Sequence, residues 1–301
     1  MKHSIFYYFF HLDKGIPALK AKISDRYYIE QQWKRIMDYP LDLDNPKTFN
    51  EKIQWLKIYN RKSQYTLLAD KYRVKEVISK TLGKQFVIPT LSVYSAVNQI
   101  KLSELPEQFV LKCNHDSGSI ILCEDKSTFD LVDAQKKLSI ALKRNYYSIS
   151  KEWVYRNIKP CIIAEPYLKD DKEKDLHDYK FFVFNGKVRC FKIDFLRYTN
   201  HGANYYDCEG NILPFGENCC KPQYDRHLDI PEQLPQLINF AEKIAKDIPF
   251  LRVDFYIVNG HIFFGERTFY PTSGYGTFTE KKWDDTLGDW LQLPSRKKCI
   301  I

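Results

Sequence analysis

The chain has 301 residues, of which 44% are hydrophobic and 28% are charged, and its formal net charge is +8. This composition is ordinary for a soluble globular protein, and the length allows one large core or two to three modules of ~100–200 residues. The lysines and arginines are spread along the chain instead of forming a tract, which disfavours a nucleic-acid partner. The net positive charge is better explained by an anionic small molecule or a nucleotide as the ligand.

The cysteines and the apolar runs argue against several further classes. The eight cysteines form no CxxC pair and no Cys/His ladder with zinc spacing. The run "IFYYFF" at residues 5–10 is far shorter than the ~20 residues that a bilayer span needs, and no signal-peptide cleavage site is evident. We therefore expect a cytoplasmic protein, whose aromatic N-terminus either packs on the fold or touches the inner face of the membrane.

The sequence pattern in the first half of the chain predicts helices followed by strands. Residues 1–40 are helix-like and aromatic and end at Pro40. Thr48 and Glu51 have the spacing of a capping box, which begins a helix. A second helix is predicted over 67–82, with Gly83 just beyond its end. Strands are predicted at 86–94, 108–114 and 120–125, and a further helix at 127–145.

The second half is richer in strand signals. A buried strand is predicted at 161–168, a turn and strand at 209–215, and an amphipathic helix at 234–248. Two hairpins are predicted at 178–198 and 251–271, because each has an Asn-Gly pair at its centre. Since helices and strands are interleaved, the predicted class is α+β or α/β with mixed sheets.

Several segments carry groups that suit a phosphate. In "FVLKCNHDSGS" a strand delivers Lys112 and a small-residue turn with Gly118 follows, so the turn can supply N–H donors and the lysine a charge. Lys71, in "DKYRVK", lies at a predicted helix start. A plain hairpin and a solvated helix lysine would give the same patterns. No GxxxxGK[ST] occurs, so a P-loop is excluded.

Two further segments can be interpreted either as part of a functional site or as ordinary structure. Glu165 directly follows an apolar strand, where the backbone can meet a purine edge or simply enter a loop. Asp178 and Lys180 are two residues apart on a predicted strand, so they share a face. They form either part of a site or an ordinary surface ion pair.

Two carboxylates, Asp254 and Glu266, lie in the apolar strands of the last hairpin. Carboxylates there are costly unless they are paired or bound to a metal, and Mg²⁺ takes carboxylate and phosphate oxygens. Pairing with Arg252 or Arg267 is the structural alternative. A strict two-residue turn would place the carboxylates on opposite faces, whereas a loop with an odd number of residues or a bulge at Gly265 would bring them to one face. The metal hypothesis therefore predicts an irregular hairpin.

The order of these features resembles the ATP-grasp superfamily. The stretches "NPKTFNEKIQWLK", "DKYRVKEVI", "LPEQFVLKCNHDSGS", "DYKFFVFNGKV" and "RVDFYIVNGHIFFGERTFYP" are similar to the TupA-like ATP-grasp family over about residues 40–294. The resemblance implies two α+β subdomains, with mixed or antiparallel sheets, that grip ATP. It implies an N-terminal helical segment at 1–40, a phosphate-loop part at about 84–160, a metal-site part at about 161–294 and a basic tail at 295–301.

The resemblance also implies the cofactors ATP and Mg²⁺ and a set of site residues. The implied nucleotide-binding residues are Lys71, Lys112, His115, Ser117, Gly118, Glu165, Tyr167, Leu168, Asp178 and Lys180. The implied metal ligands are Asp254, Glu266 and Thr268, and the implied catalytic groups are Lys112, Lys180, Arg252 and Arg267. The sequence departs from the family pattern at Thr268, where most members have Asn, and at Asp116, where glycine is usual. His201 is a further candidate for an acceptor loop.

The activity that the resemblance implies is carboxylate activation in bacterial surface polysaccharide biosynthesis. ATP phosphorylates a carboxylate of uronic-acid type, and an amine or amino acid displaces the phosphate. Two alternatives stay open. The family is often labelled glycosyltransferase, although the Asp-x-Asp at 42–44 does not end an obvious strand. A degenerate nucleotide-binding scaffold protein is the other alternative.

Overall fold

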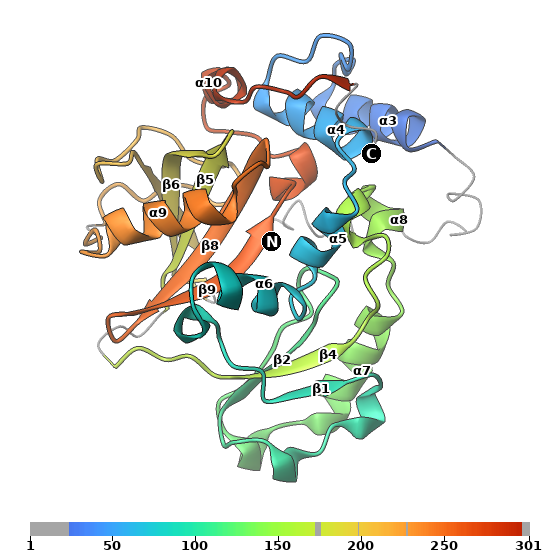
Figure 1. The fold of residues 1–301 in the computed structure, drawn as a ribbon, viewed down its shortest axis with the longest axis vertical. Coiled ribbons are helices and arrows are strands. Elements are labelled where there is room, and N and C mark those ends of the chain that lie inside the picture. Colours follow the sequence, from blue (N-terminus) through green and yellow to red (C-terminus); the bar gives the residue numbers. More distant parts are fainter. Residues whose placement is uncertain (1–23, 172–175, 198, 227, 297–301) are drawn as a thin grey trace.

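The computed structural model describes residues 24–171, 176–197, 199–226 and 228–296, and two antiparallel sheets organise it (Figure 1). The smaller sheet has the order β1-β4-β2-β3, and the larger has the order β7-β6-β5-β8-β9. The strands are β1 (Ser92–Tyr94), β2 (Phe109–Cys113), β3 (Ile121–Cys123), β4 (Ile162–Pro166), β5 (Asp178–Phe184), β6 (Lys187–Phe195), β7 (Gly202–Tyr206), β8 (Phe250–Val258) and β9 (His261–Thr268). Every pairing between these strands is antiparallel, so the class is α+β.

The helices cover one face of each sheet and cap the end of the larger one. They are α3 (Asp25–Met37), α4 (Phe49–Tyr59), α5 (Gln64–Ala69), α6 (Val74–Thr81), α7 (Leu131–Leu142), α8 (Tyr146–Ser150), α9 (Leu234–Ile244) and α10 (Lys282–Trp290). In Figure 1, α7 lies against the smaller sheet, α9 crosses the larger sheet, and α4 packs beside α10. None of the helices in the described part of the chain is long and apolar enough to cross a membrane.

Each sheet has its own hydrophobic core. Phe181, Phe191 and Phe255 lie on one face of the larger sheet, on which Phe240 of α9 packs. The alternate residues of the same strands point to the opposite face, which is why that face is free to carry charged groups. In the smaller sheet, Leu111 joins a separate core with α7, and the opposite face of β2 remains available.

Both predicted hairpins form around their Asn-Gly turns. Asn185 and Gly186 have φ angles of 48° and 83°, and Asn259 and Gly260 have φ angles of 50° and 79°. Positive φ at both central residues matches the twist of the flanking strands, and asparagine and glycine tolerate it best. The turns therefore fix the β5–β6 and β8–β9 pairings.

The helix start at Thr48 is also confirmed, but the predicted helix over 67–82 is interrupted. Thr48 and Glu51 form a complete capping box on α4. Further along, Asp70 Oδ1 accepts hydrogen bonds from the backbone N–H groups of Tyr72 (2.9 Å) and Arg73 (3.1 Å). Such a side-chain bond to the local backbone competes with the helix and produces a turn between α5 and α6. Lys71 consequently lies in that turn and not inside a helix.

Two strand predictions need correction. The segment 209–215 makes an isolated bridge between Ile212 and Tyr206, whereas the neighbouring strand is β7 at Gly202–Tyr206. β4, which we expected in the metal-site part, pairs with β1 and β2 of the smaller sheet. The change from one sheet to the other therefore falls after β4 and not near residue 160. The aromatic run at 5–10 and the end of the basic tail lie outside the described residues.

Candidate ATP and metal site

The last hairpin contains the irregularity that the metal hypothesis predicts. Val258 pairs with His261 and Phe255 with Phe264, but Asp254 pairs with Glu266, so Gly265 is taken up as a bulge. A bulge shifts the alternation of side chains by one residue. Asp254 and Glu266 are thereby brought to the same face of the sheet, directly opposite each other.

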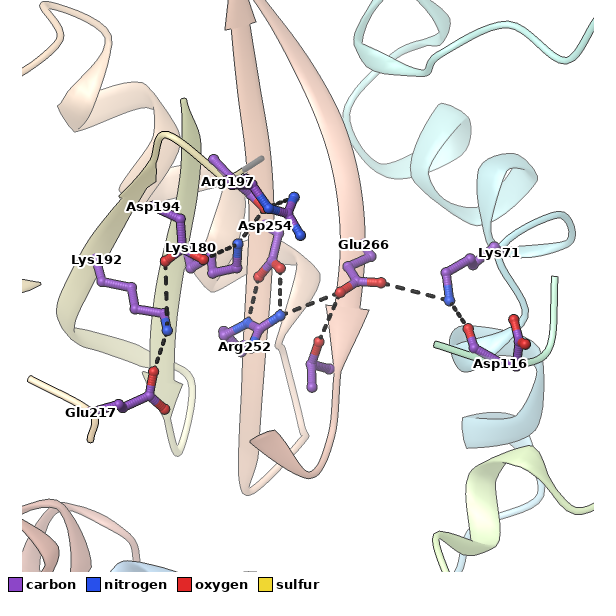
Figure 2. A network of polar contacts seen from close by, with 12 residues as sticks. Lys71, Asp116, Lys180, Lys192, Asp194, Arg197, Glu217, Arg252, Asp254 and Glu266 are labelled. Carbon is purple, nitrogen blue, oxygen red and sulfur yellow. Dashed lines mark hydrogen bonds and ion pairs between the residues drawn. The ribbon is translucent and has the colours of Figure 1, made fainter. Parts of the chain in front are cut away.

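Arg252 joins the two carboxylates. Its guanidinium donates to both oxygens of Asp254, at 2.8 and 2.6 Å, and to Glu266 Oε1 at 3.3 Å (Figure 2). Burial raises the pKa of Asp254 to about 6, and Arg252 and Lys180 limit the rise. Burial also acts to raise the pKa of Glu266, but Lys71 and Arg252 outweigh it and lower that pKa to about 2. The arginine alternative for these carboxylates is therefore present, and it involves Arg252 alone.

A row of buried charges continues from Asp254 across β5 and β6 (Figure 2). Lys180 pairs with Asp178 and, at 3.0 Å, with Asp194. Arg197 donates to Asp178 at 3.0 Å from the loop after β6, and His201 lies 3.3 Å from Asp194. The predicted Asp178–Lys180 pair thus exists, but it is buried inside a network and does not lie on the surface.

Lys71 approaches the carboxylates from the opposite side. Its Nζ lies 3.7 Å from Glu266 Oε2 and donates to the carbonyl oxygen of Asp116, as Figure 2 shows. Its backbone N–H donates to the carbonyl oxygen of Asn114 at 3.0 Å. One lysine therefore connects the loop between β2 and β3 with the hairpin of the larger sheet.

The loop between β2 and β3 turns its two charged or ionisable residues inward. Asp116 is 1% exposed, accepts a hydrogen bond from Ser119 Oγ at 2.5 Å and lies 3.7 Å from Arg144. His115 is also buried and faces the carbonyl oxygen of Arg144 at 3.2 Å. The tip of the loop, Ser117 and Gly118, is exposed, and Gly118 has a φ of 93°. The unusual aspartate therefore points into the protein, toward Ser119 and Arg144, and is not presented at the tip of the loop.

A pocket lies between the two sheets. It is lined by Ile88, Val110, Lys112, Ile120, Leu122, Glu165, Pro166, Tyr167, Leu168, Lys169, Asp170, Leu176, Arg197 and Tyr256. The lining is largely apolar and also contains charged residues, of which Glu165 is buried, Lys112 and Asp170 are partly buried and Lys169 and Arg197 are exposed. An apolar cleft with a few polar groups is the usual character of a site for a small organic ligand. The pocket brings together Lys112, Glu165, Tyr167 and Leu168, whereas Arg197 and Tyr256 were not predicted.

The side chains of the two remaining candidates on the last hairpin, Thr268 and Arg267, point to opposite faces of the sheet. Thr268 Oγ1 lies 3.5 Å from Glu266 Oε1, so the hydroxyl shares the face of the carboxylates. Arg267, the residue between them on β9, is buried and projects to the opposite, apolar face. Its Nε and Nη1 atoms have no hydrogen-bond partner among the described residues. Arg267 is therefore outside the site that Asp254 and Glu266 form.

The donor set is compatible with Mg²⁺. Asp254 and Glu266 present carboxylate oxygens on one face, and no group of three or more His, Cys, Asp or Glu side chains in the described part of the chain forms a dedicated cage. Mg²⁺ is usually held by one or two carboxylates together with substrate phosphates and water. Two carboxylates on one face, without a cage of further ligands among the described residues, fit that pattern.

The family comparison agrees with this geometry. The family described as TupA-like ATPgrasp matches residues 51–292. The chain belongs to the TupA-like ATP-grasp family. Its fold is accordingly the ATP-grasp fold, as the sequence motifs predicted, and the pocket between the sheets lies within the matched region. No curated protein gives a significant match to the chain.

The comparison with solved structures finds several ligases that are similar to the chain at low identity. D-alanine–D-alanine ligase from Bacillus anthracis, complexed with ATP, has a TM-score of 0.38 and 13% identity over 82% of this chain and 63% of that chain. The ATP-grasp ligase PsnB with its minimal precursor gives 0.40 and 12% over 72% and 60%. L-amino acid ligase from Bacillus licheniformis gives 0.43 and 10% over 83% and 55%. The chain thus spans less than two thirds of the length of each of these proteins.

Proposed function

We propose that this TupA-like ATP-grasp protein is an ATP- and Mg²⁺-dependent ligase that joins a carboxylate to an amine. The observation that supports the proposal most directly is the pairing of Asp254 with Glu266 across an irregular hairpin, beside Arg252 and Lys71. Arg252 and Lys71 already offset part of the charge of the buried Asp254 and the partly exposed Glu266, and the exposed side of Glu266 leaves oxygen atoms available to a metal ion. The apolar pocket nearby would take the adenine.

Each group then has a defined task. Tyr167 and Leu168, which line the pocket, would contact the base, and Lys112 in the pocket wall would turn from Glu165 toward the phosphates. Ser117 and Gly118 would present backbone N–H donors to the phosphates from the loop tip. Bound Mg²⁺, held by Asp254 and Glu266 with Thr268 beside them, would neutralise phosphate charge.

The chemistry is a pair of substitutions. A carboxylate oxygen of the acceptor attacks the γ-phosphorus of ATP, which gives an acylphosphate and ADP. The amine nitrogen then attacks the acyl carbon, loses a proton and releases inorganic phosphate. Positive charge fixed near the transferring phosphoryl group is what lowers the barrier, and Arg252, Lys71 and Lys180 supply it here. Arg252 would also hold the acceptor carboxylate.

The biological setting follows from the family resemblance. Surface polysaccharides carry uronic acids, so we propose a uronic-acid carboxylate as the acceptor and an amino acid or another amine as the nucleophile. The reaction would take place in the cytoplasm, with contact at the inner membrane face as part of the same proposal.

The first test is a thermal-shift experiment with Mg²⁺-ATP and, separately, Mg²⁺ with a panel of UDP-sugars. A ligand that binds the native state raises the melting temperature as its concentration exceeds Kd. We expect Mg²⁺-ATP to stabilise the wild type and to lose this effect in Asp254→Asn/Glu266→Gln. The control Asp133→Asn/Glu104→Gln removes the same charges from exposed pairs with Lys137 and Lys101 and should respond like the wild type.

The second test is catalytic. ADP release is measured with glucuronic or galacturonic acid as acceptor and hydroxylamine as a small nucleophile that traps an acylphosphate as a hydroxamate. Hydroxamate that depends on ATP and on the uronic acid would support the ligase. Stabilisation by a UDP-sugar but not by ATP would overturn the proposal in favour of a glycosyltransferase, and ATP binding without turnover on any carboxylate would favour the scaffold alternative.

A further inference from the structure

Glu165, in the wall of the pocket, divides its carboxylate between two lysines from different elements. Oε2 lies 2.6 Å from Lys112 Nζ on β2, and Oε1 lies 2.7 Å from Lys75 Nζ on α6. Glu165 is 4% exposed, so neither contact is a weak surface pair. The sequence motifs pointed to Lys112 and Glu165, but not to Lys75.

The two lysines differ in how firmly they are held. Lys75 Nζ also donates to the carbonyl oxygen of Ile88 at 2.9 Å and to Thr90 Oγ1 at 2.8 Å. That segment is itself anchored, because the Leu91 N–H donates to the carbonyl oxygen of Ala164 on β4 at 2.8 Å. For Lys112, Glu165 is the one ion-pair partner among the residues described. Lys75 is therefore fixed by three groups, and Lys112 is held by one.

This difference matters when a phosphate arrives. If Lys112 turns toward a phosphate, Glu165 loses one of its two ion pairs while its carboxylate stays buried. A buried carboxylate left without a cation is strongly unfavourable, and the exchange would be resisted. Lys75 removes that obstacle because it remains paired with Glu165 Oε1 after Lys112 has turned away.

We propose that Lys75 is a positioning residue for the nucleotide: it holds the charge of Glu165 so that Lys112 is free to bind phosphate. The proposal rests on the ATP site proposed above, which already includes Lys71, Lys112 and Lys180, and adds a fourth lysine, which acts through Glu165 without touching the nucleotide. The charges agree with it. Burial lowers the pKa of Lys75, and Glu165 opposes that shift; burial acts to raise the pKa of Glu165, but Lys112 and Lys75 outweigh it and lower that pKa.

The test is the Kd of Mg²⁺-ATP, measured by isothermal titration calorimetry on full-length variants. In Lys75→Met, Glu165 depends on Lys112 alone, and we expect ATP affinity to fall at least tenfold. The matched control is Lys80→Met on the same helix, whose lysine pairs with Glu76 on the surface, and it should stay within twofold of the wild type. Melting temperatures without nucleotide show whether each variant is folded.

The decisive measurement is the double variant Lys75→Met/Glu165→Gln. A neutral glutamine does not retain Lys112, so the second change should restore most of the affinity that the first one removes. A merely structural role of Lys75 predicts the opposite, since removing a second buried group would weaken binding further. An unchanged Kd in Lys75→Met, or a double variant as weak as Lys75→Met, would overturn the inference.

Glu165→Gln alone covers the case in which Lys75→Met does not fold. Freed from the carboxylate, Lys112 should bind ATP at least as tightly as in the wild type, and a tenfold loss would contradict the inference. If the wild type itself does not bind Mg²⁺-ATP, both the proposed function and this inference fail. If the wild type binds Mg²⁺-ATP and Lys75→Met has the same Kd, this inference fails but the proposed function does not.

Discussion

Asp254 and Glu266 lie directly opposite each other because one glycine, Gly265, is left out of the ladder between β8 and β9. Without the bulge, the Asn259-Gly260 turn would set a register in which the carboxylates point to opposite faces. A one-residue irregularity therefore decides whether this hairpin can hold a cation.

The first prediction concerns that glycine. A Cβ at Gly265 would lie 3.0 Å from the ring of Tyr256 and 3.1 Å from the carbonyl oxygen of Asp254, so Gly265→Ala must displace the strand that carries Asp254. We expect a loss of about 1–3 kcal/mol in unfolding free energy. We also expect the Mg²⁺-dependent part of ATP binding to weaken about tenfold, equivalent to about 1.4 kcal/mol.

The control for Gly265→Ala is Gly260→Ala at the tip of the same hairpin. Gly260 has a φ of 79°, and a Cβ added there would meet no other atom within 4 Å. An alanine at this position costs about 1–2 kcal/mol of backbone strain without touching the carboxylates. Its Mg²⁺ dependence should match the wild type. Equal loss of Mg²⁺-ATP binding in both variants would mean that stability alone, and not the register, governs the site.

The sequence was informative where the chemistry is local. The two Asn-Gly turns, the Thr48–Glu51 capping box and the bulge at Gly265 are all encoded within a few residues, and all are confirmed. The predicted helix over 67–82 was wrong at residues 70–73, because Asp70 bonds to the backbone that follows it. That interruption was visible only as one more polar residue in an otherwise helical pattern.

What the sequence could not supply are partners that are distant along the chain. Lys75 has the pattern of a solvated helix lysine, and only the fold brings it to Glu165, ninety positions away. The strand β7 was missed because its residues follow a polar turn, and its pairing with β6 creates the strand. Arg267 lay beside Glu266 in sequence, yet strand alternation turns it to the other face.

The second prediction concerns Lys192, the buried partner of Glu217. Glu217 has no other ion-pair partner among the residues described, while Asp194, 3.6 Å from the same Nζ, is also paired with Lys180. Lys192→Met should therefore destabilise the protein by about 3–5 kcal/mol, because it strands the carboxylate of Glu217. Urea unfolding of Lys192→Met and Lys192→Met/Glu217→Gln measures this, and the double variant should be the more stable of the two. A double variant less stable than Lys192→Met would contradict the explanation.

The third prediction is a stabilising change at Arg267. Burial lowers the pKa of its guanidinium to about 10, and two of its nitrogens lack hydrogen-bond partners among the described residues. An unsatisfied buried donor costs about 1–3 kcal/mol, so Arg267→Met should raise the unfolding free energy by that order. ATP affinity should not change, since Arg267 faces away from Asp254. A drop in stability on the same urea assay would show that an unrecognised partner holds the arginine.

The fourth prediction follows from a buried pair beneath the turn after β9. Lys57 Nζ donates to the carbonyl oxygen and hydroxyl of Ser273, at 2.7 and 2.8 Å, and so holds a turn in which Ser273 and Thr272 have φ angles of 55° and 48°. Burial raises the pKa of Glu152 to about 7, opposed by Lys57. Burial lowers the pKa of Lys57 to about 8, opposed by Glu152.

These shifts give the pair a defined effect on stability. The pKa of Glu152 is raised on folding, so its contribution is fully present below its usual value of 4.5 and is lost as pH rises through 7. The pKa of Lys57 is lowered on folding, so its penalty is relieved as pH rises from 8 toward its usual value of 10.5. We compare the unfolding free energy of the wild type with that of Lys57→Met/Glu152→Gln at each pH. The wild-type value minus the variant value should be lowest between about pH 7 and 8, roughly 3 kcal/mol below its value at pH 4.5 or 10.5. Urea unfolding of both proteins from pH 4.5 to 10.5 measures the difference, and a difference that does not vary with pH would mean that the two groups keep their ordinary pKa values inside the fold.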